Sequence, residues 1–204
     1  MKRLVYLLFI IGIVGYFANS GYCEDKSYYS GFVGAVKASD SDVDLPHDSY
    51  GSVNLEYDLG FMFGGAIGTE LGNSRLEGEI AYQKSDLGDA TVSGGSGTDQ
   101  DGNLSLSTLV FNYYYDFLKG RSFSPFVTGG IGLGSLQFNN NGHEDSDAVS
   151  LYQVGAGVSF SIKENLVMDV RYRYLVTSDA ELFHGDMKID YTAHALLVGI
   201  KVRF

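Results

Sequence analysis

The last stretch of the chain, residues 191–204 (YTAHALLVGIKVRF), constrains the fold more than any other segment. Counting back from the terminus, every second side chain is apolar, and a period of two predicts a β-strand with one apolar face. Because a soluble edge strand would not normally finish on an exposed phenylalanine, the pattern favours a strand with its apolar face in lipid and its charged face inside a barrel. The apolar positions are Leu196, Val198, Ile200, Val202 and Phe204, and the charged positions are Lys201 and Arg203.

The beginning of the chain has the organisation of a secretory signal peptide. Two basic residues precede about 14 apolar residues, and small residues follow as far as Ser20. The apolar run is shorter than the ~20 residues that a membrane helix needs, which disfavours an uncleaved helix, the alternative interpretation. Cys23 follows a bulky tyrosine rather than the small residue of a lipoprotein, so we expect a free thiol. The expected organisation is a signal peptide over residues 1–20 and one outer-membrane β-barrel domain over residues 21–204.

Composition narrows the fold class and the range of partners. The chain contains 27 glycine and 15 tyrosine residues but only two prolines, a balance typical of β-proteins. No run of ~18 apolar residues follows the signal, so no helical membrane span is predicted. Loss of the two basic residues of the signal would take the formal charge from −11 to −13. A nucleic-acid backbone would be repelled by such a chain, so no nucleic-acid partner is expected.

Alternation of apolar and polar residues predicts eight strands after the signal. The strands cover residues 28–38, 52–71, 75–87, 103–117, 123–136, 149–162, 166–176 and 191–204. Short connections at 72–74, 118–122 and 163–165 alternate with long ones near 39–51, 86–102, 137–148 and 177–190. The predicted fold class is therefore all-β, an eight-stranded antiparallel up-and-down transmembrane β-barrel with short periplasmic turns and long outer loops. A soluble lipocalin-like barrel is the alternative, and it is disfavoured because the apolar faces need an apolar medium throughout.

Several stretches make the chain resemble the small outer-membrane β-barrel proteins of Gram-negative bacteria, the eight-stranded group that includes OmpA, OmpX and the opacity proteins. They are RLEGEIAYQKSD, NYYYDF, SPFVTGGIGLG, LVMDVRYRYL and the terminal aromatic residue. The resemblance implies the fold but no single activity, because the group spans adhesins, structural barrels and proteins of unknown role. It also implies that the barrel-assembly machinery reads an assembly signal at Ile200, Val202 and Phe204. The chain departs from the group in having no tryptophan, so its interfacial belts would rest on tyrosine and phenylalanine.

The strand faces opposite the apolar ones carry charges that we expect to face the barrel lumen. An eight-stranded barrel has an interior just wide enough for side chains to fill, and buried charges there must be paired. We therefore predict that Glu77 and Glu79 pair across the lumen with basic residues of the last two strands. An ion-conducting or proton-conducting file is the alternative. The predicted network comprises Arg75, Glu77, Glu79, Asp116, Asp169, Arg171, Arg173, Lys201 and Arg203.

The long connections are acidic, and we expect them to form a solvated outer surface. The alternative is that they bind divalent cations and bridge the protein to anionic lipopolysaccharide, although none has the twelve-residue calcium spacing. The histidines His47, His143 and His184 each lie in a different long connection, so a joint metal site is conceivable, but no metal or cofactor is predicted. The acidic residues are Asp40, Asp42, Asp44, Asp48, Asp89, Asp99, Asp101, Glu144, Asp145, Asp147, Asp179, Glu181 and Asp186.

No arrangement of residues in the sequence points to catalysis. Two positions after His194, where the outer-membrane lipid A deacylase pattern has a serine, the chain has Leu196. The glycine run over 129–134 has no following helix that would present amides to a phosphate. We predict a non-enzymatic structural or surface-interaction protein, adhesion-like, that acts through its four long loops. A narrow porin or hydrophobic-solute conduit is the alternative interpretation, and an enzyme is the third interpretation. Expected partners are outer-membrane lipid, lipopolysaccharide, the barrel-assembly machinery and an extracellular ligand, and the chain is expected to be monomeric.

Overall fold

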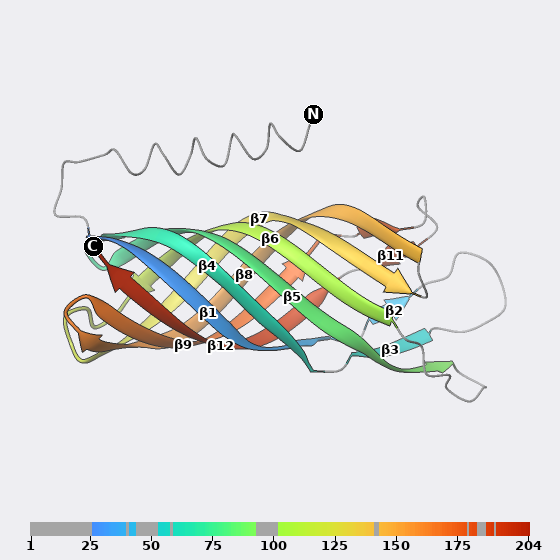
Figure 1. Cartoon of the computed structure of the whole chain (residues 1–204), viewed down its shortest axis with the longest axis horizontal. Helices are drawn as coiled ribbons and strands as arrows, with labels where there is room; N and C mark the ends of the chain where they lie inside the picture. The colour runs from blue at the N-terminus through green and yellow to red at the C-terminus, as the bar shows by residue number, and fades with distance from the viewer. Residues whose placement is uncertain are drawn as a thin grey trace.

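The computed structural model describes residues 26–39, 41–43, 53–57, 59–92, 102–140, 143–178, 180–182, 187–189 and 191–204. Eight long strands within these ranges form a closed antiparallel barrel (Figure 1). They are β1 (Lys26–Ala38), β4 (Gly60–Leu71), β5 (Ser74–Val92), β6 (Gly102–Asp116), β7 (Phe123–Asn140), β8 (His143–Lys163), β9 (Leu166–Thr177) and β12 (Thr192–Arg203). In this described part of the chain, no helix is long and apolar enough to cross a membrane.

Each barrel strand pairs with the next one along the chain, and the first and last strands pair to close the barrel. The residue opposite Phe32 of β1 is Gly199 of β12, and the backbone N–H of Phe204 donates to the carbonyl of Ser27 at 2.9 Å. The start of β1 and the end of β12 therefore lie at the same end of the barrel (Figure 1). The predicted eight-stranded, antiparallel, up-and-down architecture is confirmed.

Three short connections lie at this same end, which we call the turn end. They join β4 to β5 at residues 72–73, β6 to β7 at residues 117–122, and β8 to β9 at residues 164–165. Gly72 and Gly120 have positive φ angles of 59° and 86°, in the left-handed region that glycine adopts without a steric penalty. The predicted short connections are confirmed.

The opposite end, which we call the loop end, differs from the prediction. The expected loop over 137–148 is wrong, because β7 continues to Asn140 and β8 already begins at His143. The predicted strand over 52–71 is divided into β3 (Val53–Tyr57) and β4, which both pair with β5. Short strands also occupy parts of the predicted loops, namely β2 (Ser41–Val43), β10 (Ala180–Leu182) and β11 (Met187–Ile189). Backbone hydrogen bonding satisfies polar main-chain groups regardless of side-chain polarity, so a polar sequence can extend a hairpin.

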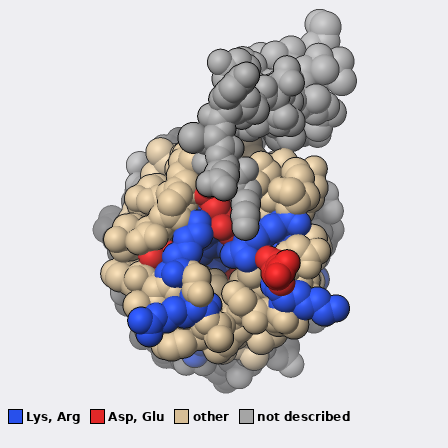
Figure 2. Space-filling view, turned by 90° about the vertical axis from the view of Figure 1, so that its left-hand side faces the viewer, with Lys and Arg blue, Asp and Glu red and all other residues tan. Residues whose placement is uncertain are grey.

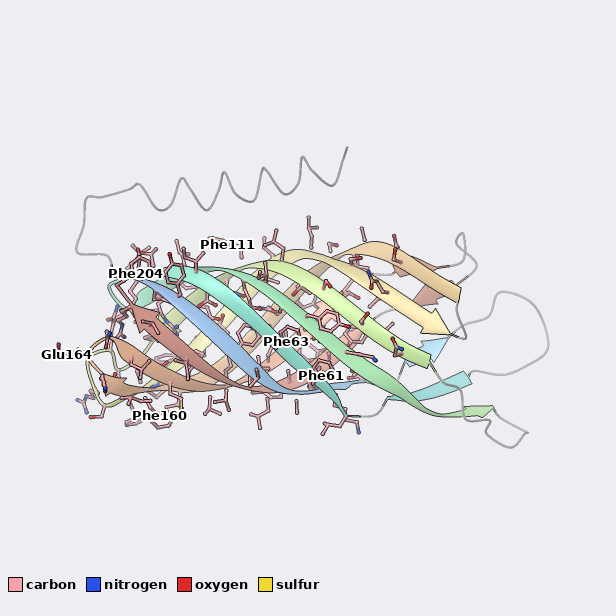
Figure 3. The ribbon with its side chains drawn as sticks, in the orientation of Figure 1. Phe61, Phe63, Phe111, Phe160, Glu164 and Phe204 are labelled. Atoms are coloured by element: carbon pink, nitrogen blue, oxygen red, sulfur yellow. The ribbon has the colours of Figure 1, made fainter. Side chains whose placement is uncertain are left out.

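The outer surface of the barrel is apolar and rich in aromatic side chains. Phe204 stacks on Tyr29 with ring centroids 4.7 Å apart at the turn end. Phe61 and Phe63 project outward farther along the barrel (Figure 3), and Phe63 packs against Tyr82 with centroids 5.6 Å apart. Tyrosine and phenylalanine thus provide the aromatic belts that a barrel in lipid requires.

Glycines on the inner surface make room for large side chains of neighbouring strands. Phe32 of β1 lies opposite Gly64 of β4, and a Cβ atom at Gly64 would lie 2.5 Å from the tip of the ring. Phe126 of β7 similarly lies opposite Gly157 of β8, where a Cβ atom would lie 2.6 Å from the ring. Aromatic rings laid over cross-strand glycines pin the strand register and fill the narrow lumen.

Candidate functional site

The lumen is the candidate site because the charged side chains converge there from opposite walls. Strands β5 and β9 are separated by three other strands in both directions around the barrel, so they face each other. The guanidinium of Arg173 on β9 donates to both carboxylate oxygens of Glu79 on β5 at 2.7 Å. The Glu79 side chain is fully buried. This bidentate pair is the strong form of a charged hydrogen bond, and it ties the two walls together.

A second carboxylate, Glu77, is held mainly by phenols. The hydroxyl of Tyr28 donates to Glu77 Oε2 at 3.0 Å, and the hydroxyl of Tyr114 donates to Oε1 at 2.9 Å. Arg171 Nη1 donates to the Tyr114 hydroxyl at 2.6 Å and lies 4.0 Å from Glu77 Oε1. The charge of Glu77 is therefore compensated by Arg171 largely through a shared tyrosine.

A third pair joins neighbouring strands nearer the turn end. Arg75 on β5 donates to both carboxylate oxygens of Asp116 on β6, at 2.9 and 3.1 Å. The Arg75 guanidinium also lies over the ring of Tyr114, 4.2 Å from its centroid. Both charged groups are buried. The combination of a bidentate pair and a cation–π contact fixes the Arg75 side chain on the wall of the lumen.

Glu70 forms ion pairs with three basic side chains at the turn end of the lumen. Its carboxylate lies 2.9 Å from Arg203 Nε, 3.1 Å from Lys119 Nζ and 3.5 Å from Lys201 Nζ. Of the four basic residues considered as partners of Glu77 and Glu79, Arg171 and Arg173 approach these carboxylates, and Lys201 and Arg203 contact Glu70 instead. β1 pairs with both β4 and β12, with Lys26 opposite Glu70 and Tyr28 opposite Arg203, so the ends of β4 and β12 meet across the start of β1.

The structure thus brings eight of the nine predicted residues into the buried lumen and places the ninth, Arg203, at its half-buried mouth. Asp169 lies beside Arg171, with 3.7 Å between the carboxylate and Nε. Sequence analysis missed Glu70, Tyr28 and Tyr114. Tyr114 shares the inward face of β6 with Asp116, so alternation could have found it, whereas Tyr28 and Glu70 lie on β1 and β4, where no lumen residue was predicted.

The half of the lumen toward the loop end is mainly apolar, which the sequence did not predict, although the polar side chains of Gln83, Ser85 and Thr177 are also buried there. Each leucine of this layer is 3% exposed or less. Val36 and Met62 pack in the same cluster. The layer lies between the charged network and the loop end and contains Leu104, Leu106, Leu136, Leu175 and Leu197.

These two halves make the lumen a poor path for ions. The charged half consists of side chains that neutralise one another, and the apolar half offers few groups that could replace the hydration shell of an ion. A hydrophobic constriction excludes water by dewetting. Among the described residues, buried ion pairs occupy the half of the lumen near the turn end, and a mainly apolar cluster occupies the half near the loop end.

The structure gives no support to a metal site shared by the histidines of the long connections. His47 and His184 lie outside the described residues, and His143 begins β8 with a side chain that is not described. His194 lies on the outer surface, with its Nδ1 2.5 Å from the Tyr172 hydroxyl and its ring 5.0 Å from that of Tyr174. No group of three or more histidine, cysteine or acidic residues that could hold a metal occurs within the ranges that the structure describes.

Most of the acidic residues of the long connections lie outside the described residues or have side chains that are not described. Asp147 is the exception, and its Oδ1 accepts from the backbone N–H of Ala148 at 2.8 Å. The side chains of Asp42, Asp89, Glu144, Asp145 and Glu181 are not described. Outside the described residues lie Asp40, Asp44, Asp48, Asp99, Asp101, Asp179 and Asp186, together with the expected signal peptide and Cys23.

Comparisons with known proteins agree with this architecture. The sequence model of the family described as outer membrane protein beta-barrel domain matches residues 12–204. The chain is 26% identical to the outer membrane protein PagN of Salmonella typhimurium (strain LT2) over 104 residues, which span 44% of either chain. It is 29% identical to the 22 kDa outer membrane protein of Rhizobium leguminosarum bv. viciae over 153 residues, 71% of this chain and 67% of the relative.

A solved structure shows the same fold. Neisserial surface protein A superposes with a TM-score of 0.62 at 19% identity, covering 87% of this chain and 97% of the other. At this identity the likeness concerns the fold alone. The matched region spans less than half the length of PagN.

Proposed function

The chain belongs to the outer membrane protein β-barrel domain family and lies in the outer membrane, and from this premise we propose that it is a sealed, non-enzymatic barrel with an adhesion-like surface role. Its outer wall contacts membrane lipid, and its long connections would meet an extracellular ligand. The observation that carries the proposal is the filled lumen, in which buried ion pairs lie below an apolar layer.

The side chains in the lumen disfavour both conduction and catalysis. A conducting pore needs hydrated space, and a catalytic site needs a nucleophile, a base and an orienting group within reach of one another. The ionisable groups of the lumen are committed to one another through bidentate contacts such as Arg173 with Glu79. Three connections at the loop end, those between β1 and β4, β5 and β6, and β9 and β12, are the longest segments between barrel strands. Such segments carry binding functions on rigid scaffolds.

One observation favours the alternative of a hydrophobic-solute conduit. The half of the lumen toward the loop end is lined by Leu106, Leu136 and Leu175, which an apolar solute could contact. Such a solute would have to displace these buried side chains and then pass the charged half beneath them. We therefore keep the sealed barrel as the proposal.

Shortening the long connections tests the surface role. We would replace residues 44–52, 93–101 or 183–186 with a two-residue Asn-Gly turn in separate variants and display each variant on bacteria. Attachment to cultured epithelial cells should fall for at least one variant, while the barrel still folds and its conductance is unchanged. Equal attachment by all three variants at equal surface amounts would overturn the proposed role.

We also propose that the two chain ends serve targeting, with residues 1–20 as a cleaved signal and the terminal strand as the assembly signal. Phe204 is exposed, in phase with Val202 and Ile200, and stacked on Tyr29. Deleting Phe204 should lower the amount of folded protein in the outer membrane, as read from the heat-modifiable band on a gel. Val127→Ala, an outward change on β7, is the control, and an undiminished band after the deletion would contradict the assembly role.

A further inference from the structure

The turn end of the barrel carries a rim of basic side chains, although the chain as a whole has a net charge of −11. Figure 2 looks onto this end and shows Lys and Arg side chains around the opening with fewer acidic ones between them. We define the turn-end rim as Lys119, Arg121, Lys163, Glu164 and Arg203. A local excess of one charge sign on a chain of the opposite sign indicates a surface suited to a partner of complementary charge.

Two basic members of the rim have no charged partner of their own. Lys119 and Arg203 both form ion pairs with Glu70, at 3.1 and 2.9 Å. Arg121 and Lys163 are exposed, and neither makes an ion pair to any residue that the structure describes. Arg121 and Lys163 are therefore the unpaired cations of the rim, and Glu164, which is also exposed, makes no ion pair to a described residue.

Arg121 and Lys163 lie close together at the ends of neighbouring strands. The backbone N–H of Ser161 donates to the carbonyl of Ser122 at 3.0 Å, which continues the β7–β8 pairing into the turn. This pairing sets Arg121 beside Ile162, next to Lys163 in the chain. The backbone register therefore places the two residues at the same edge of the rim, which we call the patch.

The patch borders the lipid-facing surface. Phe123 is 47% exposed and Ile162 is 53% exposed, and both lie on the outer face within two residues of a free cation. The turns of outer-membrane barrels face the periplasm, so this border meets the headgroups of the periplasmic leaflet. An apolar surface beside unpaired Lys and Arg matches both parts of an amphiphile, the acyl chain and an anionic headgroup.

We infer that Arg121 and Lys163 bind the headgroup phosphate of an anionic glycerophospholipid whose acyl chains lie along Phe123 and Ile162. Arginine and lysine both donate strong hydrogen bonds to phosphate oxygens, and the guanidinium can do so with two parallel donors. Membrane attraction of this kind is on the order of fivefold in affinity for each cation near the surface.

Lipid selectivity measured by electron spin resonance tests this inference. The folded protein is reconstituted in bilayers, and the motionally restricted fraction of spin-labelled phosphatidylglycerol is compared with that of spin-labelled phosphatidylcholine. The wild type should favour phosphatidylglycerol several-fold, and the double variant Arg121→Gln/Lys163→Gln should lose most of this preference. Lys37→Gln removes one exposed cation of β1 near the loop end and should retain it.

The salt dependence and the comparison of the two lipids distinguish headgroup binding from a rim that is only solvated. In 1 M salt the Debye length falls to about 3 Å, so the wild-type preference should shrink. Equal binding of the two lipids by the wild type, or a preference that survives in the double variant, would overturn the inference and leave a rim that is only solvated. A heat-modifiable band on a gel shows that each variant is folded before it is compared.

Discussion

Glu79 and Arg173 form the contact on which the lumen depends most. Both side chains are buried, and their two 2.7 Å hydrogen bonds join opposite walls. Changing Glu79 to Gln leaves the Arg173 charge buried without its partner, which typically costs 3–5 kcal/mol, so about that loss in the free energy of unfolding is expected. Urea unfolding in lipid vesicles, followed by circular dichroism, measures it.

The matched control is Glu164→Gln, because Glu164 is exposed at the turn between β8 and β9 (Figure 3). This change should alter the free energy of unfolding by less than about 0.5 kcal/mol. The double variant Glu79→Gln/Arg173→Met should recover much of the loss, because removing both charges leaves neither one unpaired. An unchanged urea midpoint for Glu79→Gln alone would contradict the pairing.

The strands themselves were largely predictable from the sequence, and their ends at the loop side were not. Alternation in segments such as 166–176 identifies both faces, because one face meets lipid and the other meets charges. Beyond the lipid both faces of a strand can be polar, so the contrast between them disappears. The polar segment 137–148 was therefore predicted as a loop, although it forms the end of the β7–β8 hairpin. The leucines at 104 and 106 were not predicted in the lumen because they lie in phase with Thr108, Asn112 and Asp116, so one face of this strand changes from apolar to polar along its length.

Glycine placement gives a prediction for strand pairing. A Cβ atom at Gly64 would lie 2.5 Å from the Phe32 ring and from the carbonyl oxygen of Ile80, so Gly64→Ala should overpack the β1–β4–β5 wall. Overpacking of this kind costs about 1–3 kcal/mol. Gly65→Ala is the adjacent control, since the nearest atom to its Cβ would be the Ser30 carbonyl oxygen at 3.5 Å. Equal urea midpoints for the two variants would show that Gly64 is not needed for close packing.

For the molecule as a whole, the sequence predicted a charged lumen in which Glu77 and Glu79 pair with basic residues of the last two strands, but it did not predict the Arg75–Asp116 pair or the contacts of Glu70. Which side chains meet depends on strand tilt and stagger, which alternation does not encode. Glu70 shows this, because its partners Lys119 and Arg203 are distant in sequence and come from a turn and from another strand. The apolar layer near the loop end likewise follows from side chains of four strands meeting at one level.

The central claim is that the barrel is sealed, and single-channel recording in a planar bilayer tests it most directly. The folded, heat-modifiable protein should give no unitary conductance steps. The double variant Leu106→Ser/Leu136→Ser, which hydrates the apolar layer, should give more current than the wild type. Stable unitary steps from the wild-type protein would contradict the account and would mean that the charged lumen holds a continuous file of water.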